Sequence, residues 1–343
     1  MPLLLDQADL PALALGAAVL GSGGGGSTHV GQIMAQRSTS WPVTVHDVAE
    51  LDPTTPCIAV GYVGSTLLLE ERLPGHAPFD EAIAAAQRWL GSPARAVCTL
   101  EAAGLNGLTA LHLAGSHQVV DADCMGRGLP DLDQLSLLID DVPGLVVCAP
   151  TGSGGVALLD GARPADVERV VRTAIESNGG WAGLVIAGFT VADLVQHAIH
   201  GSTRRALSVG RVLTLGADLD ASALASSVGG TLLGVGRVMD VRQEPDRPDV
   251  ISTDVRTSAG DVLRLVSRSE HIAALLNGKV MANSPTLVVT LDAATRAPLQ
   301  VHECTMARDL IILTLPAPQW WSQEPRRAAV ARPAHWGLDG LSA

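Results

Sequence analysis

The chain of 343 residues is long enough to form two domains, each with its own hydrophobic core. Hydrophobic residues make up 47% of the sequence and charged residues 17%, which is a globular composition and excludes a disordered chain. A net charge of -12, without any cluster of Lys or Arg, argues against partners with many phosphates, such as nucleic acids or anionic membranes.

The N-terminal segment and the cysteines bear on the compartment. Asp6 and Asp9 precede the first apolar run and the first basic residue is Arg37, so this run lacks the positive segment of a secretory signal. The five cysteines include no CxxC pair, which is typical of reduced thiols. We therefore expect a cytoplasmic protein that acts on a small molecule, with no nucleic-acid or membrane partner. We also expect a homo-oligomer.

The first two thirds of the sequence alternate between helical and strand patterns. Residues 10–20 have the pattern of a buried helix that ends at a run of glycines, and a second helix is expected to begin at Ser27. Strands are expected at 57–63, 96–100, 119–121, 145–149 and 181–187, and helices at 78–90, 106–116, 163–177 and 190–200. Apolar strands that alternate with helices predict a three-layer α/β domain with a mainly parallel sheet over residues 1–229.

The pattern changes after about residue 230. Short strands follow one another with turn residues between them, and several alternate apolar and polar side chains, as in residues 262–265. This pattern predicts an all-β, barrel-like domain over residues 230–315. The tail 316–343 has no clear period but contains three Trp, so we expect it to pack back on the α/β domain.

A glycine run, GSGGGGSTH, spans residues 21–29 between the first two helices. Glycines let backbone N–H groups approach an anion, and the following helix N-terminus adds partial positive charge. The run is thus either an anion- or carboxylate-binding turn or a tight corner between helices. The candidate substrate-binding residues here are Gly23, Gly24, Gly25 and His29. Because no Gly-Lys-Ser/Thr follows, the run is not a P-loop and no nucleotide is expected.

Polar side chains concentrate at the ends of two expected strands, within residues 101–130. Ligands of open α/β sheets gather at the carboxyl ends of strands, where buried polar groups are kept for binding or chemistry. The candidate catalytic residues are Glu101, Asn106, Asp121, Asp123 and Arg127. The alternatives are a helix N-cap for the asparagine, turn formation for the aspartates, and an ion pair between the arginine and an aspartate.

Metal-capable side chains also occur in the second half of the chain. His302 and Cys304 are spaced to share one face of a strand, and Asp123 or Cys124 from the first domain would complete an open zinc site. Zinc or another divalent metal is therefore a candidate cofactor. Glu270, near an expected strand end, is a further candidate for substrate binding. The alternative is that these polar residues lie on the surface of the β domain.

Four stretches resemble the S-methyl thiohydantoin desulfurase family, which is associated with hydantoinase and oxoprolinase genes. They are LGSGGGGSTHVG, EAAGLNGL, VVDADCMGRGLPDL and SRSEHIAALLNGKVMANSPTLVVTLD, the last followed by Glu303. The sequence departs from the family pattern at Thr28-His29, Ala102-Ala103, Ser269-Glu270 and Thr286. The resemblance implies an α/β domain followed by a barrel-like domain, with the site between them.

The resemblance also implies a hydrolase. Water would add to the ring carbon that carries the S-methyl group, and methanethiol would leave to give a hydantoin. Asp123 or Glu101 would act as the base or hold the protonated ring, Asn106 would donate to developing charge, and Arg127 would bind a substrate carboxylate. A bound zinc would replace the base by lowering the pKa of its water to about 7. The alternative is a non-catalytic subunit of a hydantoinase- or oxoprolinase-type enzyme.

Overall fold

A computed structural model describes residues 1–341 of the chain, so residues 342 and 343 of the predicted tail lie outside the described part. The first sheet has the strand order β1-β2-β5-β4-β3-β8-β6-β7, with the short β9 beside β5. Its strands are β1 (Leu3–Leu5), β2 (Val43–His46), β3 (Pro56–Gly64), β4 (Ala96–Thr99), β5 (Gln118–Asp123), β6 (Val146–Pro150), β7 (Val156–Asp160), β8 (Trp181–Thr190) and β9 (Ile199–His200).

The predicted α/β class is confirmed, with a parallel sheet at its centre. Strands β2, β5, β4 and β3 lie side by side in this order and run parallel to one another. The outer strands join in antiparallel pairs, partly because the hairpin β6–β7 folds back within a few residues. The carboxyl ends of β4 and β5 therefore meet at one edge of the sheet, as the sequence predicts.

Helices cover both faces of this sheet, which gives three layers. Alternate residues of β3 point to opposite sides: Ile58 and Val60 belong to one core, and Cys57 and Ala59 to the other. The first core is shared with α1 (Leu10–Leu20), α2 (Thr28–Ser38), α4 (Asp80–Leu90), the 3-10 helix η3 (Gly104–Leu113), α8 (Ser202–Leu215) and α9 (Ala221–Ser227). The second core is shared with α5 (Ser136–Ile139), α6 (Pro164–Ser177) and α7 (Val191–His197).

Two glycines let α1 and α8 cross in backbone contact. A Cβ built on Gly16 would lie 1.7 Å from the Ala206 oxygen, and one on Gly210 would lie 1.6 Å from the Ala12 oxygen. Any larger side chain at either position would therefore push the helices apart. This crossing fixes the end of α1 and, with it, the start of the glycine run.

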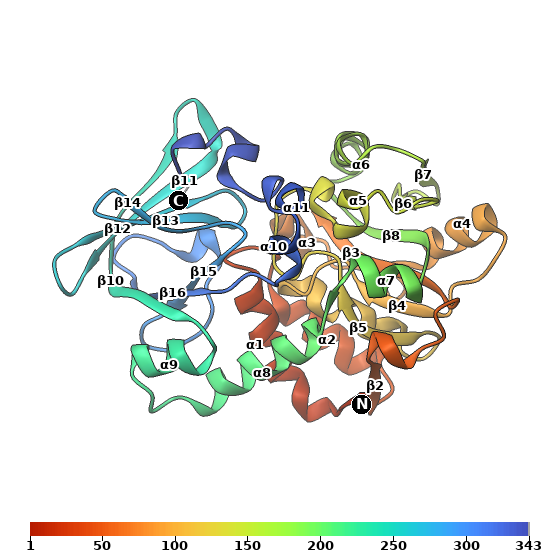
Figure 1. Cartoon of the computed structure of the whole chain (residues 1–343), viewed down its shortest axis with the longest axis horizontal. Coiled ribbons are helices and arrows are strands. Elements are labelled where there is room, and N and C mark those ends of the chain that lie inside the picture. Colours follow the sequence, from red (N-terminus) through yellow and green to blue (C-terminus); the bar gives the residue numbers. More distant parts are fainter. Residues whose placement is uncertain (342–343) are drawn as a thin grey trace.

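The second sheet is antiparallel throughout and curls into a half-barrel with its own core, which confirms the predicted barrel-like domain (Figure 1). Its strand order is β14-β13-β12-β11-β10-β16-β15. The strands are β10 (Thr231–Glu244), β11 (Arg247–Thr257), β12 (Val262–Ser267), β13 (His271–Leu276), β14 (Lys279–Asn283), β15 (Leu287–Asp292) and β16 (Asp309–Leu315).

The C-terminal tail returns to the α/β domain, and α10 (Trp320–Gln323) and α11 (Pro325–Ala329) lie between the two domains in Figure 1. The Trp321 Nε1 donates to the Met125 oxygen at 2.9 Å, and the Trp336 Nε1 donates to Asp131 at 2.6 Å. The remaining short elements are α3 (Thr66–Glu71), η1 (Gln7–Asp9), η2 (Val48–Glu50), η4 (Leu132–Gln134), η5 (Val301–Glu303), η6 (Pro333–Trp336) and η7 (Asp339–Leu341). Within residues 1–341, no helix combines the length and apolar character needed to span a bilayer.

Candidate functional site

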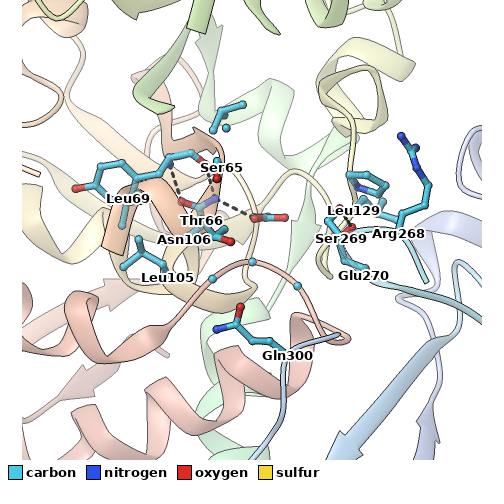
Figure 2. A pocket seen from close by; sticks show the side chains of 18 of the residues that line it. Ser65, Thr66, Leu69, Leu105, Asn106, Leu129, Arg268, Ser269, Glu270 and Gln300 are labelled. Carbon is cyan, nitrogen blue, oxygen red and sulfur yellow. Dashed lines mark hydrogen bonds between the residues drawn. The ribbon is translucent and has the colours of Figure 1, made fainter. Parts of the chain in front are cut away.

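A cavity of about 340 Å³ lies where the α/β domain meets the half-barrel. One wall comes from the ends of β3 and β4, the glycine run, α3, η3 and the loop after β5, and the other comes from the turn between β12 and β13 and from η5. Figure 2 shows Asn106 and Thr66 on one side of this space and Ser269 and Glu270 on the other. The site therefore draws on both domains.

Glu101 lies just after β4, where the chain leaves the sheet, and lines the cavity. Its side chain is only 9% exposed. The pKa of Glu101 is raised to about 8, chiefly by burial, with further contributions from the negative charges of Glu270 and Asp123. Glu101 thus keeps its proton at neutral pH and is suited to act as an acid.

Asn106 holds Glu101 in place. Its Oδ1 accepts a hydrogen bond from the Tyr62 N–H at 2.6 Å, which turns its amide nitrogen toward two acceptors. This Nδ2 donates to the Tyr62 oxygen and to Glu101 Oε1, both at 2.9 Å (Figure 2). The N-cap position of η3 is occupied by Ala103, so the alternative of a helix cap is wrong for Asn106.

Glu270 comes from the half-barrel, in the turn between β12 and β13, and is 4% exposed. Its Oε2 accepts a hydrogen bond from the Ser269 hydroxyl at 2.6 Å. Burial raises the pKa of Glu270 to about 7, and the positive charges of Arg127 and Arg268 oppose the rise. Two buried carboxyl groups, one from each domain, therefore line the same cavity with different proton affinities.

The glycine run forms the floor between the two carboxyl groups. A Cβ on Gly24 would lie 2.2 Å from Glu270 Oε1, and Gly25 has a φ of +78° and packs against Gly104. The carbonyl of Gly23 accepts a hydrogen bond from the Val301 N–H, and that of Gly25 accepts one from Leu105. The run is thus both a tight corner between helices and a wall of the cavity. His29 lies outside the cavity lining, exposed on the first turn of α2.

The two aspartates of β5 bind the protein's own backbone. Asp123 is fully buried and accepts hydrogen bonds from the N–H groups of Ala102, Met125 and Gly126 and from the Ser202 hydroxyl. Asp121 accepts hydrogen bonds from the Thr203 N–H and forms an ion pair with Arg204 at 3.0 Å. Neither aspartate lines the cavity, and Asp123 matches the turn-forming alternative.

Arg127 is also fully buried and is not among the lining residues. Its guanidinium donates to the carbonyl oxygens of Gly128, His271, Pro285 and Thr286. The predicted ion pair with an aspartate of β5 is not found among the described residues. With its donors committed to backbone carbonyls, Arg127 is not placed to bind a substrate carboxylate.

The four predicted metal ligands do not lie together. Cys124 is buried in the core beneath the α/β sheet, whereas Cys304 is buried in the half-barrel, with its sulfur 3.5 Å from the Thr290 hydroxyl. His302 lines the cavity on η5, so the prediction that residues 302–304 form a strand is wrong. In the described part of the chain, the potential ligands that cluster are instead Asp131, Asp133 and His335.

Two cavity-lining arginines were missed in the sequence. Arg268, two residues before Glu270, donates to Asp131 and Asp249 and has side-chain exposure of 22%. Arg172, on α6, donates to Glu168 and to the Pro130 oxygen. The stretch SRSEH could have drawn attention to Arg268, but Arg172 lies on the polar face of a surface helix, where no pattern marks it.

Comparison with known proteins agrees with this two-part arrangement. The family model described as S-Me-THD-like, N-terminal domain matches residues 8–161, and the one described as S-Me-THD-like, C-terminal domain matches residues 162–341. The chain belongs to the S-Me-THD-like family. This is the S-methyl thiohydantoin desulfurase family that its motifs resemble.

The family's domain boundary differs from the change of architecture in the structure. The second S-Me-THD-like domain begins before α6 and so includes β8, α7 and α8 of the α/β layers as well as the half-barrel. A crystal structure of a protein from Chromobacterium violaceum has the same fold, with a TM-score of 0.82 and 22% identity over 99% of this chain and 98% of that chain. A search of curated proteins finds no match.

Proposed function

We propose that the protein hydrolyses the C–S bond of an S-methyl thiohydantoin-type ring, releasing methanethiol and leaving a hydantoin. Membership of the S-Me-THD-like family supports the substrate class. The observation that carries the chemistry is the pair of buried carboxyl groups, Glu101 and Glu270, on opposite sides of one cavity. The cavity, about 340 Å³, falls in the range of roughly 300–1,000 Å³ that is usual for small-molecule sites.

The reaction needs one group that takes a proton from water and one that gives a proton to the ring. Burial raises the pKa of Glu270 to about 7 and that of Glu101 to about 8. The Ser269 hydroxyl, Arg127 and Arg268 oppose the rise at Glu270, whereas the negative charges of Glu270 and Asp123 add to the rise at Glu101. At a pH between about 7 and about 8, the two carboxyl groups together hold one proton, which is on Glu101. Glu270 is therefore the base and Glu101 the acid in this proposal.

The first step adds water across the ring C=N bond. Glu270 takes a proton from water, the hydroxyl oxygen bonds to the carbon that bears the S-methyl group, and Glu101 gives its proton to the ring nitrogen. In the second step the added hydroxyl returns its proton to Glu101 as the carbonyl forms. The C–S bond breaks with its electron pair, and the methanethiolate takes the proton from Glu270, so both carboxyl groups return to their initial states.

Asn106 and the arginines have supporting roles in this proposal. Asn106 fixes the orientation of the Glu101 carboxyl, because its amide is already aligned by the backbone of Tyr62. Arg268 and Arg172 line the cavity, where Arg268 pairs with Asp131 and Asp249 and Arg172 pairs with Glu168. In this proposal the carboxylate-binding role that the sequence suggested for Arg127 passes to Arg268 and Arg172, because these two side chains line the cavity and Arg127 does not.

The test is turnover by the purified protein of an S-methyl thiohydantoin, with released methanethiol measured by a thiol reagent. Glu101→Gln and Glu270→Gln should each lower kcat by at least about 100-fold. Glu244→Gln, on β10 and outside the cavity lining, is the matched control and should keep wild-type turnover. Full activity in either cavity variant refutes the assignment. No turnover by the wild type, together with stable binding to a hydantoinase-type enzyme, would favour an accessory subunit.

A further inference from the structure

The segment from Asp123 to Arg127 connects the two sides of the cavity although neither end of it lines the cavity. We propose that this segment is a positioning brace that sets the separation of the Glu101 and Glu270 carboxyl groups across the domain interface. The inference rests on the function proposed above and gives a role to the motif residues that the chemistry does not use. Asp123 and Arg127 are positioning residues in this scheme.

One end of the brace holds the backbone beside Glu101. Asp123 Oδ2 accepts a hydrogen bond at 2.8 Å from the N–H of Ala102, the residue next to Glu101 in the chain. The same carboxylate accepts hydrogen bonds from the N–H groups of Met125 and Gly126, so it closes its own turn at the same time. A shift of Asp123 would therefore move the loop that carries Glu101.

The other end holds the backbone beside Glu270. Arg127 donates at 3.3 Å to the oxygen of His271, the residue next to Glu270, and at 3.1 and 2.9 Å to Pro285 and Thr286 of the half-barrel. Its Nε donates to Gly128 within its own loop at 2.9 Å. One buried guanidinium thus ties four carbonyl groups from two domains, which a neutral or shorter side chain cannot do.

The segment between these ends is itself immobilised. The N–H of Cys124 donates to the Leu100 oxygen at 3.0 Å, and the Cys124 oxygen accepts from the N–H of Ser136 at 2.7 Å. Gly126 has a φ of +71°, and a Cβ on it would lie 2.4 Å from a Pro318 ring carbon in the tail. Because the segment is held by contacts on each side, a displacement at one end should displace the other end, and with it the neighbouring carboxyl group.

The charge of Arg127 gives the brace a measurable electrostatic signature. The charged groups that act on Glu270 are Arg127, Arg268 and Asp131, and Arg127 also acts on Glu101. Glu101 faces the negative charges of Glu270 and Asp123. Removal of the Arg127 cation should therefore raise the pKa of Glu270, whereas a purely packing role would leave that pKa unchanged.

The experiment compares Arg127→Gln and Arg127→Lys with the wild type. Proteins labelled with ¹³C at the glutamate carboxyl carbons are titrated by NMR, and the Glu270 signal is assigned by its loss in Glu270→Gln. In Arg127→Gln the titration of Glu270 should move upward, on the order of one pH unit. Arg127→Lys carries a cation only while its buried amine is protonated, and it cannot make all four hydrogen bonds, so its Glu270 titration should lie between those of the wild type and Arg127→Gln.

Turnover gives the positional readout. In Arg127→Lys, kcat should fall by about tenfold or more, with a smaller change in KM, because misplacement of reacting groups acts mainly on the chemical step. Arg327→Lys is the matched control, since Arg327 is a buried arginine of the tail that binds Asp140 outside the cavity. It should move neither the Glu270 titration nor kcat.

The outcomes separate the brace from the proposed function. If both Arg127 variants are folded and titrate and turn over as the wild type does, the brace is refuted. If Arg127→Gln does not fold, Arg127→Lys alone decides, and an unchanged kcat overturns the proposal. If the wild type has no turnover, the proposed function fails, while the carboxyl titrations still show whether Arg127 controls Glu270.

Discussion

Gly24→Ala is a small change that tests the assignment of Glu270 directly. The added methyl group would lie 2.2 Å from Glu270 Oε1 and 2.6 Å from its Cδ and Cγ, where 3.4 Å is an ordinary contact. Because three atoms of Glu270 are involved and the side chain is 4% exposed, the carboxyl group has to move by about 1 Å or adopt another rotamer. Gly24 is absent from the positive-φ residues, so alanine adds no backbone strain there.

A displacement of about 1 Å at a reacting group can cost about 100-fold in rate, which corresponds to about 2.7 kcal/mol of transition-state stabilisation. We therefore expect Gly24→Ala to lower kcat for methanethiol release by about this factor. The overpacked contact should also cost about 1–3 kcal/mol in the free energy of unfolding. Steady-state kinetics and thermal melts measure the two effects separately.

Gly115→Ala is the matched control, because a Cβ at Gly115 would meet nothing within 4 Å and its φ is not positive. It should leave both kcat and the melting temperature close to those of the wild type. If Gly24→Ala is folded and turns over at the wild-type rate, Glu270 is not the base, or its position does not matter to the reaction. A folded Gly24→Ala with wild-type turnover would therefore refute the reasoning.

Four further predictions concern the two carboxyl groups, Asp123 and a bound metal. A plot of kcat/KM against pH should be bell-shaped, falling below about 7 as Glu270 gains a proton and above about 8 as Glu101 loses one; a flat profile from pH 6 to 9 would contradict the acid–base assignment. Because burial raises the pKa of Glu101 from 4.5 to about 8, its contribution to stability is complete below pH 4.5 and is lost as the pH rises through 8. Glu101→Gln, which stays neutral, should therefore melt above the wild type at pH 8.5 and not at pH 4, as calorimetry can check. Asp123→Asn should keep the fold and much of the activity, since its amide oxygen can accept from the Ala102 N–H while its nitrogen donates to Ser202; complete loss of turnover in a folded protein would return Asp123 to a catalytic role. Dialysis against a chelator should leave kcat unchanged, because the proposed acid and base are both carboxyl groups of the chain; loss of activity that zinc restores would point to a metal, for which Asp131, Asp133 and His335 are the clustered candidates in the described part of the chain.

Much of the fold follows from local patterns in the sequence. Helix α1 occupies the predicted residues 10–20, and α6 (Pro164–Ser177) lies within the predicted range 163–177. Helix α8 was missed because contacts outside the segment determine it: it crosses α1 at Gly210, a residue that on its own disfavours a helix. The antiparallel outer strands also depend on tertiary pairing that no local period encodes.

The site was partly predictable for a similar reason. Glu101 and Asn106 were found because polar residues at the end of a buried strand point to the edge of a sheet where ligands bind. The same rule overvalued Asp123 and Arg127, since a sequence does not show whether a buried polar side chain faces a cavity or its own backbone. Arg172 was missed because its approach to the cavity depends on how α6 packs.

The arrangement of the cavity also bears on how such proteins can diverge. One carboxyl group belongs to each half of the chain, and Glu270 packs on a glycine that lies far earlier in the sequence. A substitution near either carboxyl group therefore changes the surroundings of the other. Substitutions in one half of the chain should be accompanied by matching substitutions in the other half. Chimaeras that exchange only one half between distant relatives should lose activity before they lose solubility. Substitutions that restore activity should occur where the two domains meet at the cavity.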